Sequence, residues 1–146
     1  MTAPDFIRDR SLPFAVGVAS TVFLTALSAR VGRARAEAGV PYPYMYAERH
    51  DAEKDSAKHI FNCTQRAHQN TLEWYPSFLL LLLGASIEHP AAAAVAGAVW
   101  LASRWVFAEG YCTGDPAKRN RGVFGMLGLL ALLGMSAKTA VAMIVA

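Results

Sequence analysis

Apolar residues gather into four stretches along this chain, and shorter polar segments separate them. The stretches cover about residues 13–35, 61–87, 90–111 and 122–146. At about 1.5 Å of rise per residue, a helix over any of them is long enough to cross a hydrocarbon core about 30 Å thick. Glycines recur in the last stretch, where small residues let membrane helices approach closely. The pattern predicts an all-α membrane protein with four tightly packed transmembrane helices in a single domain, residues 1–146.

The first stretch has a competing interpretation as a cleaved secretory signal, because residues 27–29 form a weak cleavage motif. Two aspartates, however, cancel the two arginines that precede the stretch. The segment therefore lacks the positive bias that begins a signal peptide. We expect a retained helix.

Composition and charge agree with a membrane protein. Of the 146 residues, 54% are hydrophobic and 17% are charged, which is more apolar than a soluble domain of this size needs to be. The formal net charge of +3 is small and is spread between the apolar stretches, so a nucleic-acid partner is not indicated. Basic residues gather in the first and third connections. The positive-inside rule places these connections in the cytoplasm, although Arg8 and Arg10 argue weakly for the opposite orientation.

The first connection is polar over its whole length. It includes Pro41–Tyr44 and continues into a mixed-charge run, Glu48–Lys58, whose lack of an apolar period predicts a surface loop. Cys63 and Cys112 are too few for a disulfide framework, and we expect reduced thiols. The four histidines have no metal-type spacing, so no metal is expected.

A stripe of polar residues opens the second apolar stretch. At 100° per residue its members fall on one helical face, and an unpaired charge in hydrocarbon costs about 3 kcal/mol. Two interpretations are equally open. The stripe could join helices through hydrogen bonds, with Arg66 paired to a carboxylate on a neighbouring helix, or it could form a functional site. The polar stripe consists of Asn62, Arg66, Gln69, Asn70 and Glu73.

If the four helices alternate in direction, cationic and aromatic residues from other helices come to the same membrane face as Arg66 of the stripe. The first two helices meet at the first connection, and the last two meet at the third. The residues that converge would suit a small anionic ligand, which favours the functional interpretation. They are Arg35, Arg66, Tyr111, Arg119 and Arg121.

The segment Phe61–Glu73 closely resembles the signature of the MAPEG family, the membrane-associated proteins of eicosanoid and glutathione metabolism. It is most similar to the branch of microsomal glutathione S-transferase 3. Further similar segments are Tyr42–Tyr46, Gly110–Pro116 and Lys118–Gly122, in the same order along the chain. The resemblance implies a four-helix up-and-down bundle that forms a homotrimer, with glutathione bound between subunits at the cytosolic helix ends.

The resemblance also implies roles for individual residues. Tyr111 and three stripe residues, Arg66, Asn70 and Glu73, match the family's glutathione contacts. Arg35 matches a basic contact at the end of the first helix. His68 matches a position that reaches glutathione from the neighbouring subunit, and the thiol-activating arginine maps to Arg121, with Arg119 as the alternative.

These assignments imply a glutathione transferase with glutathione-dependent peroxidase activity and no metal. Lowering the pKa of a free thiol by about two units, from about 8.5, needs roughly 2.7 kcal/mol, which one or two charge-assisted hydrogen bonds from an arginine can supply. The second substrate, a lipophilic electrophile or a lipid hydroperoxide, would arrive from the membrane lipid along Trp100, Trp105 and Phe107. These aromatic residues could equally be ordinary lipid-facing packing.

Two departures from the family pattern separate the alternatives. Trp74 stands where leukotriene-synthesising relatives have tyrosine, and Phe107 stands where many members have tyrosine. Both make a leukotriene C synthase type activity the second choice. A non-catalytic lipid-binding adaptor and a structural four-helix protein are the non-enzymatic alternatives. The expected location is the endoplasmic reticulum membrane in a eukaryote or the inner membrane in a bacterium.

Overall fold

The computed structural model describes residues 3–145, and all regular structure in that range is helical. Four long helices dominate, and three short helical segments lie before and between them. In chain order the elements are α1 (Ala3–Asp9), α2 (Ser11–Glu37), α3 (Arg49–Ala52), α4 (Ser56–Glu88), α5 (Pro90–Tyr111), the 3₁₀ helix η1 (Pro116–Gly122) and α6 (Gly125–Val145).

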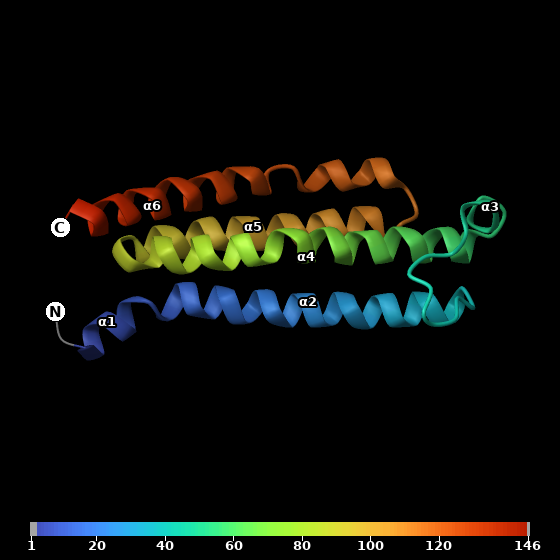
Figure 1. Ribbon diagram of the computed structural model, residues 1–146, viewed down its shortest axis with the longest axis horizontal. Helices are drawn as coiled ribbons and strands as arrows, with labels where there is room; N and C mark the ends of the chain where they lie inside the picture. Colours follow the sequence, from blue (N-terminus) through green and yellow to red (C-terminus); the bar gives the residue numbers. More distant parts are fainter. Residues whose placement is uncertain (1–2, 146) are drawn as a thin grey trace.

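The four long helices lie side by side and alternate in direction (Figure 1). Helices α4 and α5 contact each other and form the middle of the molecule, with α2 packed on one side and α6 on the other. Both ends of the chain lie at one end of the molecule, and α3 lies at the opposite end. The α2–α4 connection and η1 therefore both lie toward the end remote from the termini.

Three of the long helices, α2, α5 and α6, are long and apolar enough to cross a membrane. Helix α4 has 33 residues and is also long enough, but its first half carries the polar stripe. The sequence predicts four membrane-crossing helices, and length with composition confirms three of them. For α4 to cross the membrane as well, the polar groups of its stripe need hydrogen-bond or ion-pair partners.

The core lies in the middle of the four long helices. Phe78 on α4 stacks on Trp100 of α5, with ring centroids 3.8 Å apart and an interplanar angle of 11°. Leu82 and Leu132 are almost completely buried around them. On the other side, the Tyr75 hydroxyl lies 3.0 Å from Ser20 Oγ and thus bridges α4 to α2. Stacked rings and an interhelical hydroxyl contact hold the middle of the molecule together.

Helix α6 approaches α5 closely because α6 has a glycine at the contact between the two helices. A Cβ atom at Gly128 would lie 2.5 Å from the carbonyl oxygen of Ala96, whereas one at Gly134 would meet nothing within 4 Å. The glycines of the last apolar stretch thus differ in role, and Gly128 is one that a close approach requires.

Two element boundaries differ from the sequence expectations. The run Glu48–Lys58 contains α3 and the first turn of α4, because the Asp55 side chain caps α4 by accepting from the backbone nitrogens of Ala57 and Lys58. The expectation of a loop throughout this run is therefore wrong. The last long helix begins at Gly125 and not at about 122, because Asp115 and Pro116 start a separate 3₁₀ segment before it.

Candidate functional site

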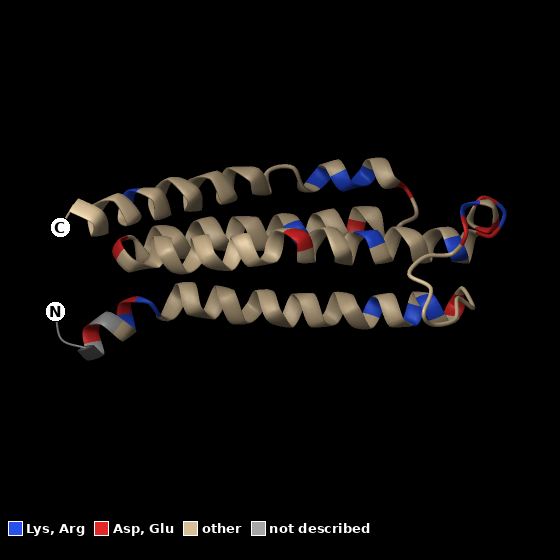
Figure 2. Ribbon diagram, in the orientation of Figure 1, with Lys and Arg blue, Asp and Glu red and all other residues tan. Residues whose placement is uncertain are grey.

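Most of the basic side chains lie at the end of the molecule remote from the termini (Figure 2). They come from the last turns of α2, the first half of α4 and η1, which the fold brings to one end. This is the convergence that alternating helices predict.

Three residues of the polar stripe bond to one another within α4. The Arg66 guanidinium donates to both carboxylate oxygens of Glu73, at 2.7 and 3.3 Å. Asn70 donates to the same carboxylate at 3.2 Å. Arg66 therefore pairs with a carboxylate on its own helix, and not with one on a neighbouring helix as the interhelical interpretation of the stripe supposed. Both partners stay about half exposed, so the pair contributes little to stability and remains open to a ligand.

Arg104 on α5 is the partner of this network that our sequence reasoning missed. Its Nη2 donates to Asn70 Oδ1 at 3.0 Å and to Thr71 Oγ1 at 2.9 Å. Its guanidinium lies 3.9 Å from the ring centroid of Phe107, and the residue is only 9% exposed. The signal was present in the sequence, because Arg104 is the one basic residue of the largely apolar stretch 90–111.

The other two stripe residues hold the α2–α4 connection. Asn62 exchanges two hydrogen bonds with the backbone of Ala47, at 2.8 and 3.0 Å. Gln69 accepts a hydrogen bond from the hydroxyl of Tyr46. Burial raises the pKa of Tyr46, and the nearby Arg66 guanidinium opposes that rise. The connection is thereby fixed beside Arg66, and Tyr46 becomes a neighbour of the charged network.

Two of the expected ligand contacts lie apart from this network. Arg35 is buried at the end of α2, where it donates to the carbonyl oxygens of Tyr44 and Val40 at 2.7 and 3.4 Å. Its guanidinium also lies 4.5 Å from the Tyr42 ring centroid. Arg35 thus anchors the α2–α4 connection within its own chain. His68 is half-buried on α4 and takes part in none of the contacts described for the network.

A cavity of about 180 Å³ lies where α4, α5, η1 and α6 meet. Arg104 and Arg119 line it together with the aromatic side chains of Trp74, Trp100 and Phe107. Two arginines therefore face a small space that is otherwise mostly apolar. Such a space suits a group that carries negative charge on a larger apolar body.

Tyr111, Arg119 and Arg121 lie around the end of α5. The Arg119 guanidinium is 5.8 Å from the Tyr111 ring centroid, and the Tyr111 ring meets Phe107 edge-on at 5.7 Å. Arg121 is exposed on η1 and is not among the residues that line the cavity. Within one chain, the structure therefore brings Arg119 to the cavity and leaves Arg121 outside it.

The two cysteines are free and buried. Cys112 packs in a small core with Leu27, Ala67 and Ala108. Burial raises the pKa of the Cys112 thiol, so this group is protonated near neutral pH. Packing, and not thiolate chemistry, is the role that this setting supports.

Three long apolar helices and a charged, partly apolar site at one end define the class of protein, and they fit an integral membrane protein. The chain belongs to the MAPEG family, which it matches over residues 10–141. That family includes membrane glutathione transferases and related enzymes.

Proposed function

We propose that this protein is a membrane-bound glutathione transferase with glutathione-dependent peroxidase activity, of the kind typical of microsomal glutathione S-transferase 3. The observation that carries the proposal is the network of Arg66, Asn70, Glu73 and Arg104 beside a cavity that Arg104 and Arg119 line. A site of this composition offers separate partners for the charged groups of one small peptide.

Glutathione has two carboxylates and one ammonium group. In the proposed complex, Arg66 and Arg104 receive carboxylate oxygens through charge-assisted hydrogen bonds, and Glu73 receives the ammonium group. Asn70 and Tyr111 supply neutral hydrogen bonds. The half-exposed Arg66–Glu73 pair supports this arrangement, because both side chains can turn to a ligand at small cost.

The thiol of glutathione would enter the cavity beside Arg119. A guanidinium there stabilises the thiolate, and about 2.7 kcal/mol of differential stabilisation lowers a thiol pKa by about two units. The family resemblance implies Arg121 for this role with Arg119 as the alternative, and the lining of the cavity favours Arg119. The thiolate then attacks an electrophilic carbon and displaces its leaving group, or it attacks the outer oxygen of a hydroperoxide. In the second case the O–O bond breaks, glutathione becomes its sulfenic acid, and the departing alkoxide takes a proton from water to form the alcohol.

The aromatic walls of the cavity support an apolar second substrate. Trp74, Trp100 and Phe107 line it, and Trp100 is already fixed by stacking on Phe78. Trp74 occupies space in which a leukotriene-synthesising relative would have a tyrosine hydroxyl. A leukotriene C synthase type activity therefore stays the second choice. A non-catalytic adaptor would need no arginine such as Arg119 in the lining of the cavity.

The proposal includes a homotrimer in which α4 is the fourth membrane-crossing helix. Glutathione then lies between subunits at the cytoplasmic helix ends, and His68 reaches it from the neighbouring chain. Arg35, which holds the α2–α4 connection in its own chain, would position the rim of the site and not touch glutathione.

The test uses purified protein in detergent micelles with glutathione and two acceptors, a chlorinated nitrobenzene and a lipid hydroperoxide. We expect Arg119→Ala to lose at least tenfold in kcat with either acceptor, and Arg66→Ala to raise the KM for glutathione about tenfold. Lys118→Ala is the matched control, because Lys118 lies on the same 3₁₀ helix and pairs only weakly with Asp115, at 3.6 Å.

Wild-type protein that binds glutathione but turns over neither acceptor would be an adaptor, and the proposed function would be wrong. Loss of turnover in Arg121→Ala with full turnover in Arg119→Ala would move the activating charge to Arg121. Glutathione binding that Arg66→Ala leaves unchanged would remove the polar stripe from the ligand site.

A further inference from the structure

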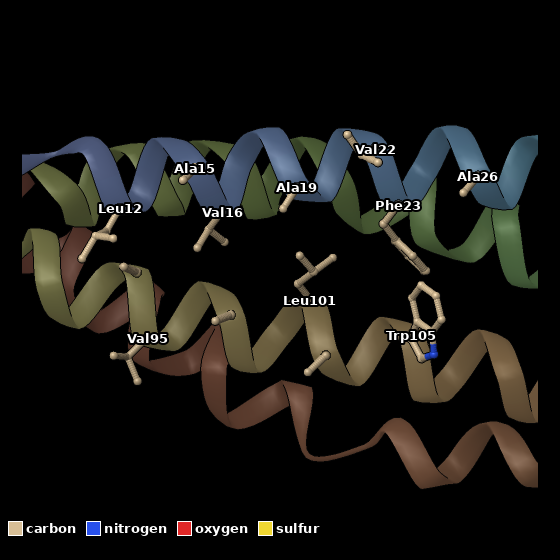
Figure 3. Close-up of a pocket in the computed structure, with 13 residues that line it drawn as sticks. Leu12, Ala15, Val16, Ala19, Val22, Phe23, Ala26, Val95, Leu101 and Trp105 are labelled. Atoms are coloured by element: carbon tan, nitrogen blue, oxygen red, sulfur yellow. The ribbon is translucent and has the colours of Figure 1, made fainter.

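An apolar groove of about 830 Å³ runs between α2 and α5, away from the proposed active site. Figure 3 shows Leu12, Val16 and Ala19 on one wall and Val95 and Leu101 on the other. Along α2 the lining extends from Leu12 to Ala26, which corresponds to about 20 Å of helical rise. That length exceeds the roughly 15 Å of hydrocarbon in one leaflet.

Two aromatic rings mark one end of the groove. Phe23 on α2 and Trp105 on α5 point toward each other in Figure 3, and their ring centroids are 5.8 Å apart. Both rings, together with Ala26, also line a second hollow of about 170 Å³ that continues toward the charged end of the molecule. The two hollows therefore adjoin, and the rings stand between them.

The second hollow has charged residues in its lining, whereas the groove has none. Arg30, Arg33 and Glu109 line it. Arg30 and Glu109 form an ion pair at 2.6 Å, which neutralises one of the two arginines. Arg33 is exposed and forms no ion pair with any residue that the structure describes. The second hollow, which forms the mouth of the groove, thus presents one net positive charge beside the apolar groove.

We propose that this groove is a binding site for a free long-chain fatty acid, with the acyl chain between α2 and α5 and the carboxylate at Arg33. The apolar length matches one acyl chain, and the single net charge matches one carboxylate. The proposal does not depend on the proposed glutathione chemistry, whose residues lie around a different cavity.

A transmembrane helix of a second copy fits the observations less well. A helix with its side chains is about 10 Å wide, whereas the Phe23 and Trp105 rings narrow the groove at the point where it meets the mouth. A second helix would also bury the charge of Arg33, for which the described residues offer no ion-pair partner. A fatty acid avoids both problems, because its flexible chain can pass the Phe23 and Trp105 rings and its carboxylate can neutralise Arg33.

The test uses the full chain in phosphatidylcholine nanodiscs and an eighteen-carbon fatty acid that carries a photoactivatable diazirine, with the cross-linked peptides mapped by mass spectrometry. We expect cross-links on α2 and α5, competition by oleate, and competition at least tenfold weaker by oleyl alcohol, which lacks the charge. Arg33→Gln should weaken oleate competition about tenfold, and Arg33→Lys should retain most of it.

Filling the groove tests its walls separately. Ala19 and Ala98 both line it and are exposed, so Ala19→Leu and Ala98→Leu add volume without replacing a core residue. Both should abolish cross-linking, while Ala131→Leu on the exposed face of α6 should leave it unchanged. A tryptophan emission spectrum and a thermal unfolding midpoint like those of the unsubstituted protein show that each variant folds.

Three outcomes would overturn the proposal. Cross-links spread evenly over the exposed residues of α6 would mean that the probe samples only bulk lipid. Unchanged competition by oleate in Arg33→Gln would remove the carboxylate from the mouth. Cross-links between α2 of one chain and a helix of another, made without any fatty acid bound, would make the groove an interface between copies.

Discussion

Replacement of Arg104 by methionine tests the contact on which the proposed site depends. Arg104 joins α5 to α4 through two hydrogen bonds from one nitrogen, to Asn70 at 3.0 Å and to Thr71 at 2.9 Å. Its guanidinium also stacks over Phe107. Methionine has a similar length and no charge, so Arg104→Met removes these contacts and leaves most of the apolar packing in place.

The size of the effect follows from these contacts. Interhelical hydrogen bonds in membrane proteins contribute about 0.6 kcal/mol on average and about 1.7 kcal/mol at most, so two of them give about 1–3 kcal/mol. A desolvated cation–π contact adds about 1–2 kcal/mol. Against this, Arg104 Nε is buried with no hydrogen-bond partner among the described residues, which costs about 1–3 kcal/mol. We expect Arg104→Met to lower the free energy of unfolding by about 1–2 kcal/mol.

Reversible unfolding in mixed micelles, followed by tryptophan fluorescence, measures this loss. Trp100 lies four residues before Arg104 in the same helix and reports on α5 directly. Arg121→Met is the matched control, because the same substitution at an exposed arginine should stay within about 0.5 kcal/mol.

A double-mutant cycle with Asn70→Ala isolates the contact itself. We expect a coupling free energy of about 0.6–1.7 kcal/mol between the two positions. A coupling within the error of about 0.3–0.5 kcal/mol that independent sites show would refute the reasoning, because Arg104 would then not hold Asn70 in place. The KM for glutathione should rise in both single variants if Asn70 positions the ligand as proposed.

Two further predictions concern packing and the α2–α4 connection. Gly128→Ala should lower the free energy of unfolding by about 1–3 kcal/mol, since the added Cβ would press on the backbone of Ala96. Gly134→Ala should be neutral or slightly stabilising, because nothing lies within 4 Å of its Cβ position. Unfolding of both variants measures the difference, and equal effects would contradict the prediction. The raised pKa of Tyr46 means that its share of stability is complete below the ordinary value of 10.0 and is lost as pH rises above it. Tyr46→Phe should flatten the fall in stability above about pH 10, with Tyr44→Phe as the control, and a slope that Tyr46→Phe leaves unchanged would contradict the assignment.

The four long helices could be predicted from the sequence, because the length of each apolar stretch indicates a helix. The stretch 90–111 coincides with α5, since Pro90 begins the helix and the polar turn after Tyr111 ends it. The start of α6 could not be placed, because Gly122 and Gly125 read equally well as helix starts. The Asp115 cap and Pro116 begin the separate 3₁₀ helix η1, which packs against α5 and occupies the chain as far as Gly122.

The candidate site could be predicted in composition but not in connectivity. The angular period places Arg66, Asn70 and Glu73 on one face of α4, and their mutual hydrogen bonds agree with that placement. Periodicity could not reveal that Asn62 and Gln69 hold the α2–α4 connection, because that depends on the path of a loop without regular structure. Arg104 was visible only as the one basic residue of a largely apolar stretch, and its partners Asn70 and Thr71 lie on another helix.

The pairing of Arg66 with Glu73 on the same helix has a consequence for the synthesis of the protein. Arg104 follows Asn70 by 34 residues. At roughly 5–20 residues per second, the ribosome adds it about 2–7 s later. During this interval α4, the proposed fourth membrane-crossing helix, has no α5 beside it, and Arg66 and Glu73 can already neutralise each other. An ion pair within one helix lets the segment enter the bilayer with almost no net charge before its final partner has been made.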